Sequence, residues 1–317
     1  MDQTAPVKVL LVVDTHKWAW GRMARGIQKY APSRYQVDVC DSSEFGGDYL
    51  AEDYGAVCQF SWVESGTKWR KNERWTTVVA SHGIEFYLDE IDHWIIPHRI
   101  INNLRNRERA EERLIYFDSV LCVNRKLYKI VEEISGNAEL TLPGVDCELF
   151  SRRRWPTGPL TVGWCGQKSG TTKGYQEILE PLMEQLTDIS WKLNTRNAAT
   201  ALNDKEMADW YNDIDVLIST SCSEGCQMPI LEAHASGRPV IATDVGAARD
   251  SGVKDKFLVK AYQTKQDAEE TLRSMAQILK SLDRNGCRLH GKICRIYAET
   301  VLSWNRKADI WLRKIIR

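Results

Sequence analysis

Short apolar runs alternate with longer amphipathic stretches along the chain. Several of the apolar runs consist almost entirely of Val, Leu and Ile, which is typical of strands that are covered on both faces. Helical periodicity predicts helices over Arg99–Tyr116, Tyr175–Leu186 and Asp267–Leu282. Because strands that alternate with helices form parallel sheets, the pattern predicts an α/β fold. The predicted strands are Val7–Val13, Ala56–Phe60, Thr77–Ala80, Ser119–Val123, Leu160–Cys165, Ser190–Asn194, Val216–Thr220 and Pro239–Thr243.

The stretch Leu142–Pro159 has the composition of a linker. It contains three prolines, two glycines and the run Arg152–Arg154. A chain of 317 residues fits two domains, since single domains run to about 100–200 residues. We therefore expect one α/β domain at 1–150 and a second, which begins with a strand, at 151–298.

Charge and cysteine usage exclude several classes of protein. Lys+Arg and Asp+Glu both number 43, so the net charge does not indicate a polyanionic partner. No apolar run approaches the roughly 18 residues of a membrane span, and the first residues lack the pattern of a signal peptide; a cytoplasmic location is expected. The nine cysteines are scattered without a Cys-x-x-Cys pair, which favours reduced thiols over disulfides or a zinc site.

The segment Asp215–Asp250 puts polar residues where α/β proteins bind ligands. The strand Val216–Thr220 leads into the loop Ser221–Gln227, and a helix is predicted to begin near Met228 with Pro229 in its first turn. Ligands of open α/β sheets lie beyond the carboxyl ends of the strands. The N-terminus of the helix there offers backbone N–H groups and a positive dipole end to a phosphate.

Two glutamates flank this predicted anion site. Glu224 lies in the loop, and Glu232 lies within about one turn of the start of the helix. Carboxylates in that position accept hydrogen bonds from ribose and hexose hydroxyls. The spacing alone fits an alternative equally well, in which Glu232 complements the helix dipole and Glu224 is solvated without binding a ligand.

The stretch EGCQMPILEAHASGRPVIAT resembles the EGxxxxxxEAxAxGxPVIAT signature of the retaining glycosyltransferases of family 4. The resemblance extends from about Val120 to the C-terminus. It implies the GT-B fold, in which two Rossmann-like doubly wound domains with parallel sheets face each other across a cleft, and a C-terminal helix at 299–317 that crosses back to the first domain. Further matching elements are Leu142–Phe150, Leu160–Gly174, Asp209–Asp215 and Trp304–Trp311.

The resemblance also implies roles for individual residues. Lys173 would bind the donor diphosphate, Glu232 the ribose and Glu224 the hydroxyls of the sugar. His82, in a His-Gly pair after a predicted strand, would touch the transferred sugar, although a core histidine fits this position as well. Glu224, Lys173 and His82 form the expected catalytic set, and the expected donor-binding set is Gln167, Lys168, Lys173, Gly174, Glu224, Gly225, Cys226, Gln227, Met228 and Glu232.

Lys173 also has a physical argument of its own. Thr171 or Thr172 is suited to cap a helix that runs to about Leu186. A lysine in the first turn opposes the helix macrodipole unless an anion such as a diphosphate lies there. The alternative is a solvated surface lysine.

Two departures from the family pattern limit what the resemblance carries over. Gln167 stands where the family usually has an arginine, and the ammonium group of Lys168 cannot copy a bidentate guanidinium. The stretch between Trp191 and Met207 is shorter than usual near the expected nucleobase pocket, so the identity of the nucleotide is not predicted.

The first domain offers weaker signals. Trp18 and Trp20 follow the first strand and can stack on a sugar or base on the acceptor side, although tryptophans are more often core residues. The arginine-rich stretch Arg99–Arg113 is either a solvated helix face with paired charges or a contact for an anionic acceptor.

These observations predict a retaining hexosyltransferase that uses a nucleoside diphosphate sugar. The resemblance implies that no cofactor and no obligate metal are needed, and the sequence agrees in that no carboxylate pair with Asp-x-Asp spacing follows a strand. The acceptor stays open among lipid, polysaccharide, protein and modified DNA bases, and peripheral membrane contact is compatible with the sequence. The main alternative is a protein on the same fold that binds a nucleotide sugar or nucleic acid without catalysis. Dehydrogenase and P-loop motifs are absent from the sequence.

Overall fold

A computed structural model describes residues 5–16, 19–60, 76–79, 110–111, 114–115, 117–169, 172–195 and 202–317. It divides the chain into two units. The described residues up to Gly144 form the first unit together with Ser303–Arg317, and Val145–Leu302 form the second. The division between Gly144 and Val145 falls inside the stretch Leu142–Pro159 that the sequence indicated as a linker, where the expected boundary was residue 150.

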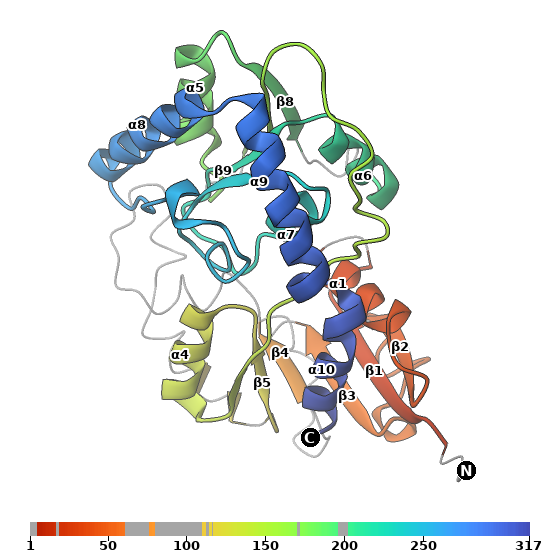
Figure 1. Cartoon of the computed structure of the whole chain (residues 1–317). Helices are drawn as coiled ribbons and strands as arrows, with labels where there is room; N and C mark the ends of the chain where they lie inside the picture. The colour runs from red at the N-terminus through yellow and green to blue at the C-terminus, as the bar shows by residue number, and fades with distance from the viewer. Residues whose placement is uncertain are drawn as a thin grey trace. The chain divides into compact units, whose positions relative to one another are not determined.

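The first unit is built on a parallel six-stranded sheet with the order β2-β1-β3-β4-β5-β6 (Figure 1). Helix α1 packs against α10, and α10 packs in turn on β3 and β4. The strands are β1 (Val7–Val13), β2 (Tyr35–Asp41), β3 (Ala56–Phe60), β4 (Thr76–Val79), β5 (Val120–Cys122) and β6 (Ala138–Leu140), and the helices are α1 (Ala19–Lys29), α4 (Arg125–Ser135) and α10 (Trp304–Ile316), with a 3₁₀ turn at Ala51–Asp53.

The last helix belongs to the first unit because its tryptophans are built into it. The Trp304 ring lies so close to Gly26 and Gly144 that a Cβ at either glycine would come within 2.4 Å of it. The Trp311 indole donates to the carbonyl of Leu142 at 3.1 Å, and its ring stacks on Phe60 at 6.1 Å. The side chains of Trp304, Trp311 and Phe60 are all buried, so the C-terminal helix completes the core of this unit.

The second unit holds a parallel five-stranded sheet with the order β11-β10-β9-β7-β8. Its strands are β7 (Thr161–Gly166), β8 (Ser190–Thr195), β9 (Val216–Ser219), β10 (Val240–Thr243) and β11 (Leu258–Val259). The helical segments are a π-helix (Tyr175–Leu179) that continues into α5 (Glu180–Gln185), α6 (Asp204–Asn212), α7 (Met228–Ala235), a 3₁₀ turn (Asp255–Phe257), α8 (Lys265–Ser281), α9 (Arg284–Tyr297) and a second π-helix (Ala298–Leu302).

A buried ion pair ties the amino ends of these elements together. The Asp215 carboxylate is fully buried just before β9. It accepts hydrogen bonds from both Nε and Nη2 of Arg284, at 3.1 and 2.9 Å, in the first turn of α9. It also accepts the backbone N–H of Thr161 at the start of β7 at 2.9 Å. Three separate segments therefore depend on one carboxylate.

The predicted α/β class and the eight predicted strands are confirmed, with ends within one residue. The sequence did not predict strands β2, β6 and β11. Strands β6 and β11 are short. Strand β2 lies at the edge of its sheet, is only partly buried, and carries the polar residues Gln36 and Asp38. The predicted helix at Asp267–Leu282 is confirmed as α8, and most of Arg99–Tyr116 lies outside the described residues. All nine cysteines are free thiols, as expected.

Replacing Asp215 with Ala should lower the free energy of unfolding by about 3–5 kcal/mol, because it leaves a half-buried guanidinium without its counterion. Urea unfolding followed by tryptophan fluorescence measures the loss. Arg249→Met removes an exposed partner of Asp244 and Asp255 and serves as the control, with little change expected. Equal stability of the two variants would contradict a structural role for the buried pair.

His234 in α7 gives the stability a dependence on pH. Its ring is buried, its Nδ1 lies 3.2 Å from the carbonyl of Ser251, and burial lowers its pKa from 6.5 to about 4. The unfolded chain takes up the proton near pH 6.5, whereas the native chain takes it up only near pH 4. The contribution of His234 to the free energy of unfolding should therefore be constant above about pH 7 and fall by about 3 kcal/mol as the pH drops from 6.5 to 4.

His234→Gln should remove that part of the slope in urea-unfolding series between pH 4 and 7. Identical slopes for the variant and the parent chain would show that other groups cause the pH dependence.

Candidate functional site

The strand order of the second unit has a point of reversal between β7 and β9. The chain leaves β7 toward β8 on one side, and it leaves β9 toward β10 and β11 on the other. The loops that follow β7 and β9 therefore diverge from neighbouring strand ends. In doubly wound sheets this is where ligands bind.

Backbone and side-chain hydrogen bonds join these two loops. The N–H of Cys222 donates to the carbonyl of Thr172 at 2.9 Å. The Thr220 hydroxyl donates to the carbonyl of Lys173 at 2.7 Å and accepts from the indole of Trp164 at 3.0 Å. The backbone of Lys173 is thus held by Thr220, the residue that follows β9.

Gly174 makes this close approach feasible. Its φ of +64° lies in the left-handed region, and a Cβ there would lie 2.1 Å from the Thr220 carbonyl oxygen and 2.2 Å from the Tyr262 hydroxyl. The prediction that Lys173 lies in the first turn of a helix is wrong, because the left-handed Gly174 precedes the helix and the helical segment begins at Tyr175. Lys173 lies instead in the loop.

Lys173 and Glu224 form an ion pair across the two loops. Glu224 also accepts the hydroxyl of Ser221 at 2.8 Å. The Glu224 side chain is 4% exposed, whereas that of Lys173 is 29% exposed. A partly exposed lysine therefore pairs with a buried carboxylate at the point where the strand order reverses.

Glu232 lies in the second turn of α7 and is buried. Its Oε2 accepts the hydroxyl of Tyr211 at 2.8 Å, and Tyr211 is itself fully buried in α6. The matching stretch Asp209–Asp215 holds the end of α6, the buried Tyr211 and the buried Asp215 that precedes β9. The structure places both signature glutamates in buried hydrogen-bonded positions on consecutive elements.

The remaining predicted donor residues surround the loops and the start of α7. Gln227 is the N-cap residue of α7, and Met228 and Pro229 open its first turn. Gln227 donates from Nε2 to the carbonyl of Val245 at 3.1 Å, while its buried Oε1 has no hydrogen-bond partner in the part of the chain that the structure describes.

The other predicted positions differ in exposure. Gln167 and Lys168 are exposed after β7, with the Lys168 ammonium 4.7 Å from the centre of the Tyr175 ring. Gly225 is buried and Cys226 is half-buried in the loop after β9. All of these positions therefore lie on the two loops at the reversal point or at the first turn of α7.

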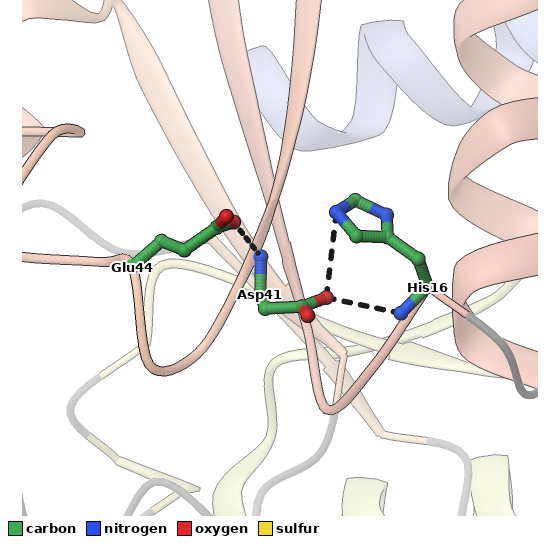
Figure 2. Close-up of side chains that lie close together, drawn as sticks. All are labelled: His16, Asp41 and Glu44. Atoms are coloured by element: carbon green, nitrogen blue, oxygen red, sulfur yellow. Dashed lines mark hydrogen bonds and ion pairs between the residues drawn. The ribbon is translucent and has the colours of Figure 1, made fainter.

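The first unit brings together a second set of polar groups, at the carboxyl ends of β1 and β2. Figure 2 shows that the backbone N–H of His16 and its ring both face Asp41, whose own N–H donates to Glu44 at 2.7 Å. The His16 N–H donates to Asp41 Oδ1 at 3.0 Å, and the ring Nε2 lies 3.4 Å from the same oxygen. One nitrogen and two carboxylate groups lie within 4.8 Å of one another, a donor set suited to a cation.

This cluster was missed by sequence reasoning because Asp41 ends a strand that was not predicted. The available signal was the histidine in the loop after β1. Strand β1 pairs with β2, and its last residue, Val13, lies opposite Asp41. Burial raises the pKa of Asp14 at the end of β1, and the nearby Asp41 adds to the rise.

Of the residues expected on the acceptor side, one is described. Trp20 is half-buried in α1 and meets Phe60 edge to face at 5.9 Å. Trp18 and His82 lie outside the described residues. In the described part of the chain no helix has the length and apolar character to cross a membrane.

Comparison with known proteins matches residues 173–281 to the family model described as Glycosyl transferases group 1. The matched segment begins at Lys173 and includes Glu224 and Glu232. D-inositol 3-phosphate glycosyltransferase of Paenarthrobacter aurescens is 32% identical over 111 residues, and that of Corynebacterium urealyticum is 29% identical over 136. These alignments cover 34% and 41% of this chain but 25% and 30% of the relatives' own lengths.

Solved structures resemble the chain over nearly its whole length. Sucrose-phosphate synthase from Thermosynechococcus elongatus superposes with a TM-score of 0.71 at 14% identity and covers 96% of this chain and 98% of its own. HepE from Anabaena in complex with UDP-glucose gives 0.62 at 13% identity over 96% and 99%. The expected fold class, the GT-B type of α/β protein, is confirmed.

Gly174→Ala should lower the free energy of unfolding by roughly 2–5 kcal/mol, since it adds a left-handed penalty to a clash with the Thr220 carbonyl. Gly136→Ala is the matched control: its φ is +67° but nothing lies within 4 Å of its Cβ, so about 1 kcal/mol is expected. Equal losses in urea unfolding would rule out the proximity of the two loops.

Proposed function

We propose that the chain is a glycosyltransferase that moves a hexose-type sugar from a nucleoside diphosphate sugar to an acceptor hydroxyl, with retention of configuration. The ion pair of Lys173 and Glu224 at the reversal point of the second sheet carries the proposal. Both residues lie in the segment that matches the glycosyl transferase family model. The inositol phosphate enzymes and the UDP-glucose complex of HepE support the same class of reaction.

Lys173 and the start of α7 are assigned to the donor diphosphate. The Lys173 side chain is partly exposed and its ammonium pairs with Glu224. The start of α7 contributes the positive end of its helix dipole, which favours an anion. In its first turn Pro229 has no N–H, and the N–H groups of Met228 and Ile230 donate to the carbonyls of Cys226 and Gln227. When the diphosphate binds, it takes the place of Glu224 as the partner of the Lys173 ammonium group. Lys173 then stabilises the negative charge that develops on the leaving nucleoside diphosphate.

Glu224 is then released to accept hydrogen bonds from hydroxyls of the transferred sugar. Glu232 is assigned to the ribose, and the Tyr211 hydroxyl donates to one oxygen of the Glu232 carboxylate. The unpartnered Oε1 of Gln227 is a further acceptor next to the start of α7, because a buried acceptor without a donor is costly until a ligand supplies one. Gln167, Lys168, Gly174, Gly225, Cys226 and Met228 complete the proposed donor site.

The acceptor side is proposed to lie on the first unit, with Trp18, Trp20 and His82. Family resemblance supports transfer without an obligate metal and without a cofactor. The acceptor is a hydroxyl compound whose class is left to experiment.

Glu224→Gln and Lys173→Met should each reduce kcat/KM for transfer by roughly 10²-fold or more, because each removes a charge that faces the reacting groups. Glu232→Gln should mainly raise KM for the donor, since its contact lies away from the bond that breaks. The exposed Glu269 and Lys280 of α8 provide the matched controls Glu269→Gln and Lys280→Met. Full activity of both glutamate variants would overturn the assignment.

A thermal-shift panel identifies the donor and separates the diphosphate site from the reaction. Nucleoside diphosphates should stabilise the chain more than the corresponding nucleosides, since binding to the native state raises the melting temperature. Lys173→Met should abolish that difference. Stabilisation by a nucleotide sugar without transfer or donor hydrolysis would favour the non-catalytic binding protein instead.

A further inference from the structure

Helix α9 presents an apolar stripe to solvent. Its inner face carries Gly291, where a Cβ would lie 2.0 Å from the carbonyl of Gly237, so this face packs tightly behind α7. On the outer face Leu289, Ile293 and Ile296 are 60%, 42% and 60% exposed. Their spacing of four and three residues places them in one line on the helix, which runs along the second unit in Figure 1. Three adjacent exposed aliphatic side chains indicate a contact surface.

Cations border the stripe on both sides. Arg288 and Lys292 are exposed on one flank, and the Arg288 guanidinium lies 5.8 Å from the centre of the Trp155 ring. On the other flank His290 Nε2 lies 2.8 Å from the ammonium of Lys256. Burial, Lys256 and Lys254 together lower the pKa of His290, in that order.

The acids near this helix are engaged elsewhere. The sequence of α9 contains no aspartate or glutamate. Asp255, beside Lys256, pairs with Arg249 at 2.5 Å, and Glu299 pairs with Arg295 at 2.7 Å. Asp283 caps the helix at its far end. The border of the stripe is therefore cationic among the described residues.

We propose that the outer face of α9 docks on a lipid bilayer that contains anionic headgroups. Leu289, Ile293 and Ile296 enter the boundary between headgroups and acyl chains, and Arg288, Lys292 and Lys256 contact the headgroups. An apolar line between rows of cations is the arrangement of helices that lie in a membrane interface. Three side chains are too few for a stable second copy of the chain, which needs about 20–30 residues a side. The proposal does not depend on glycosyl transfer.

Vesicle sedimentation of the whole chain tests this surface without any donor. We expect binding to vesicles of phosphatidylcholine mixed with phosphatidylglycerol, and weaker binding to phosphatidylcholine alone. The triple variant Leu289→Ser, Ile293→Ser and Ile296→Ser should lose at least about tenfold in partitioning to both vesicles. The double variant Arg288→Gln and Lys292→Gln should lose about fivefold per cation, only with the anionic vesicles.

Ile310→Ser is the control, since Ile310 is 50% exposed on α10, outside this stripe; it should bind as the parent chain does. All substituted positions are exposed, so unchanged melting temperatures verify folding of the variants. No binding to anionic vesicles, or unchanged binding by the triple variant, overturns the proposal. So does a dimer in solution that the triple variant abolishes, because the stripe would then be covered by a second copy.

Discussion

The approach of Gly174 to the end of β9 is the constraint on which the second unit's site depends. Since only a glycine fits against the Thr220 carbonyl with a left-handed backbone, the loop after β7 can lie directly on the loop after β9. Thr220 then bonds the Lys173 carbonyl while Trp164 and Tyr262 hold Thr220 in turn. The Lys173–Glu224 pair follows from this backbone contact, and with it the charge arrangement assigned to a diphosphate sugar.

Stability and function draw on different ends of the same sheet. At the amino ends of β7 and β9, Asp215 binds Arg284 and the N–H of Thr161 in a fully satisfied, buried arrangement. At the carboxyl ends, the partly exposed Lys173 pairs with the buried Glu224. Nearby, the buried Oε1 of Gln227 lacks a donor among the described residues. A buried acceptor that lacks a donor costs stability, which is typical of sites where a ligand supplies the missing partner.

The two proposed surfaces of the second unit use separate elements. The donor site is formed by the loops after β7 and β9 and by the start of α7, whereas the lipid contact is formed by the outer face of α9. Because α9 packs behind α7 through Gly291 and Gly237, one helix pair carries both surfaces. In the proposed reaction, a bilayer contact there would place transfer near a membrane, and the residues proposed to bind the acceptor belong to the first unit.

The sequence by itself determined the α/β class, the linker, the course of the strands and the two signature glutamates. Continuous apolar runs and glycine or proline boundaries are local signals, and they identified β7, β9 and α7 almost to the residue. It misplaced Lys173 in a helix, because Gly174 is left-handed and lies against Thr220 and Tyr262, which are distant in sequence. It also could not pair His16 with Asp41, Tyr211 with Glu232 or Lys173 with Glu224. Each of those contacts joins different strands or helices, so only the order of strands in the folded sheets decides which side chains meet.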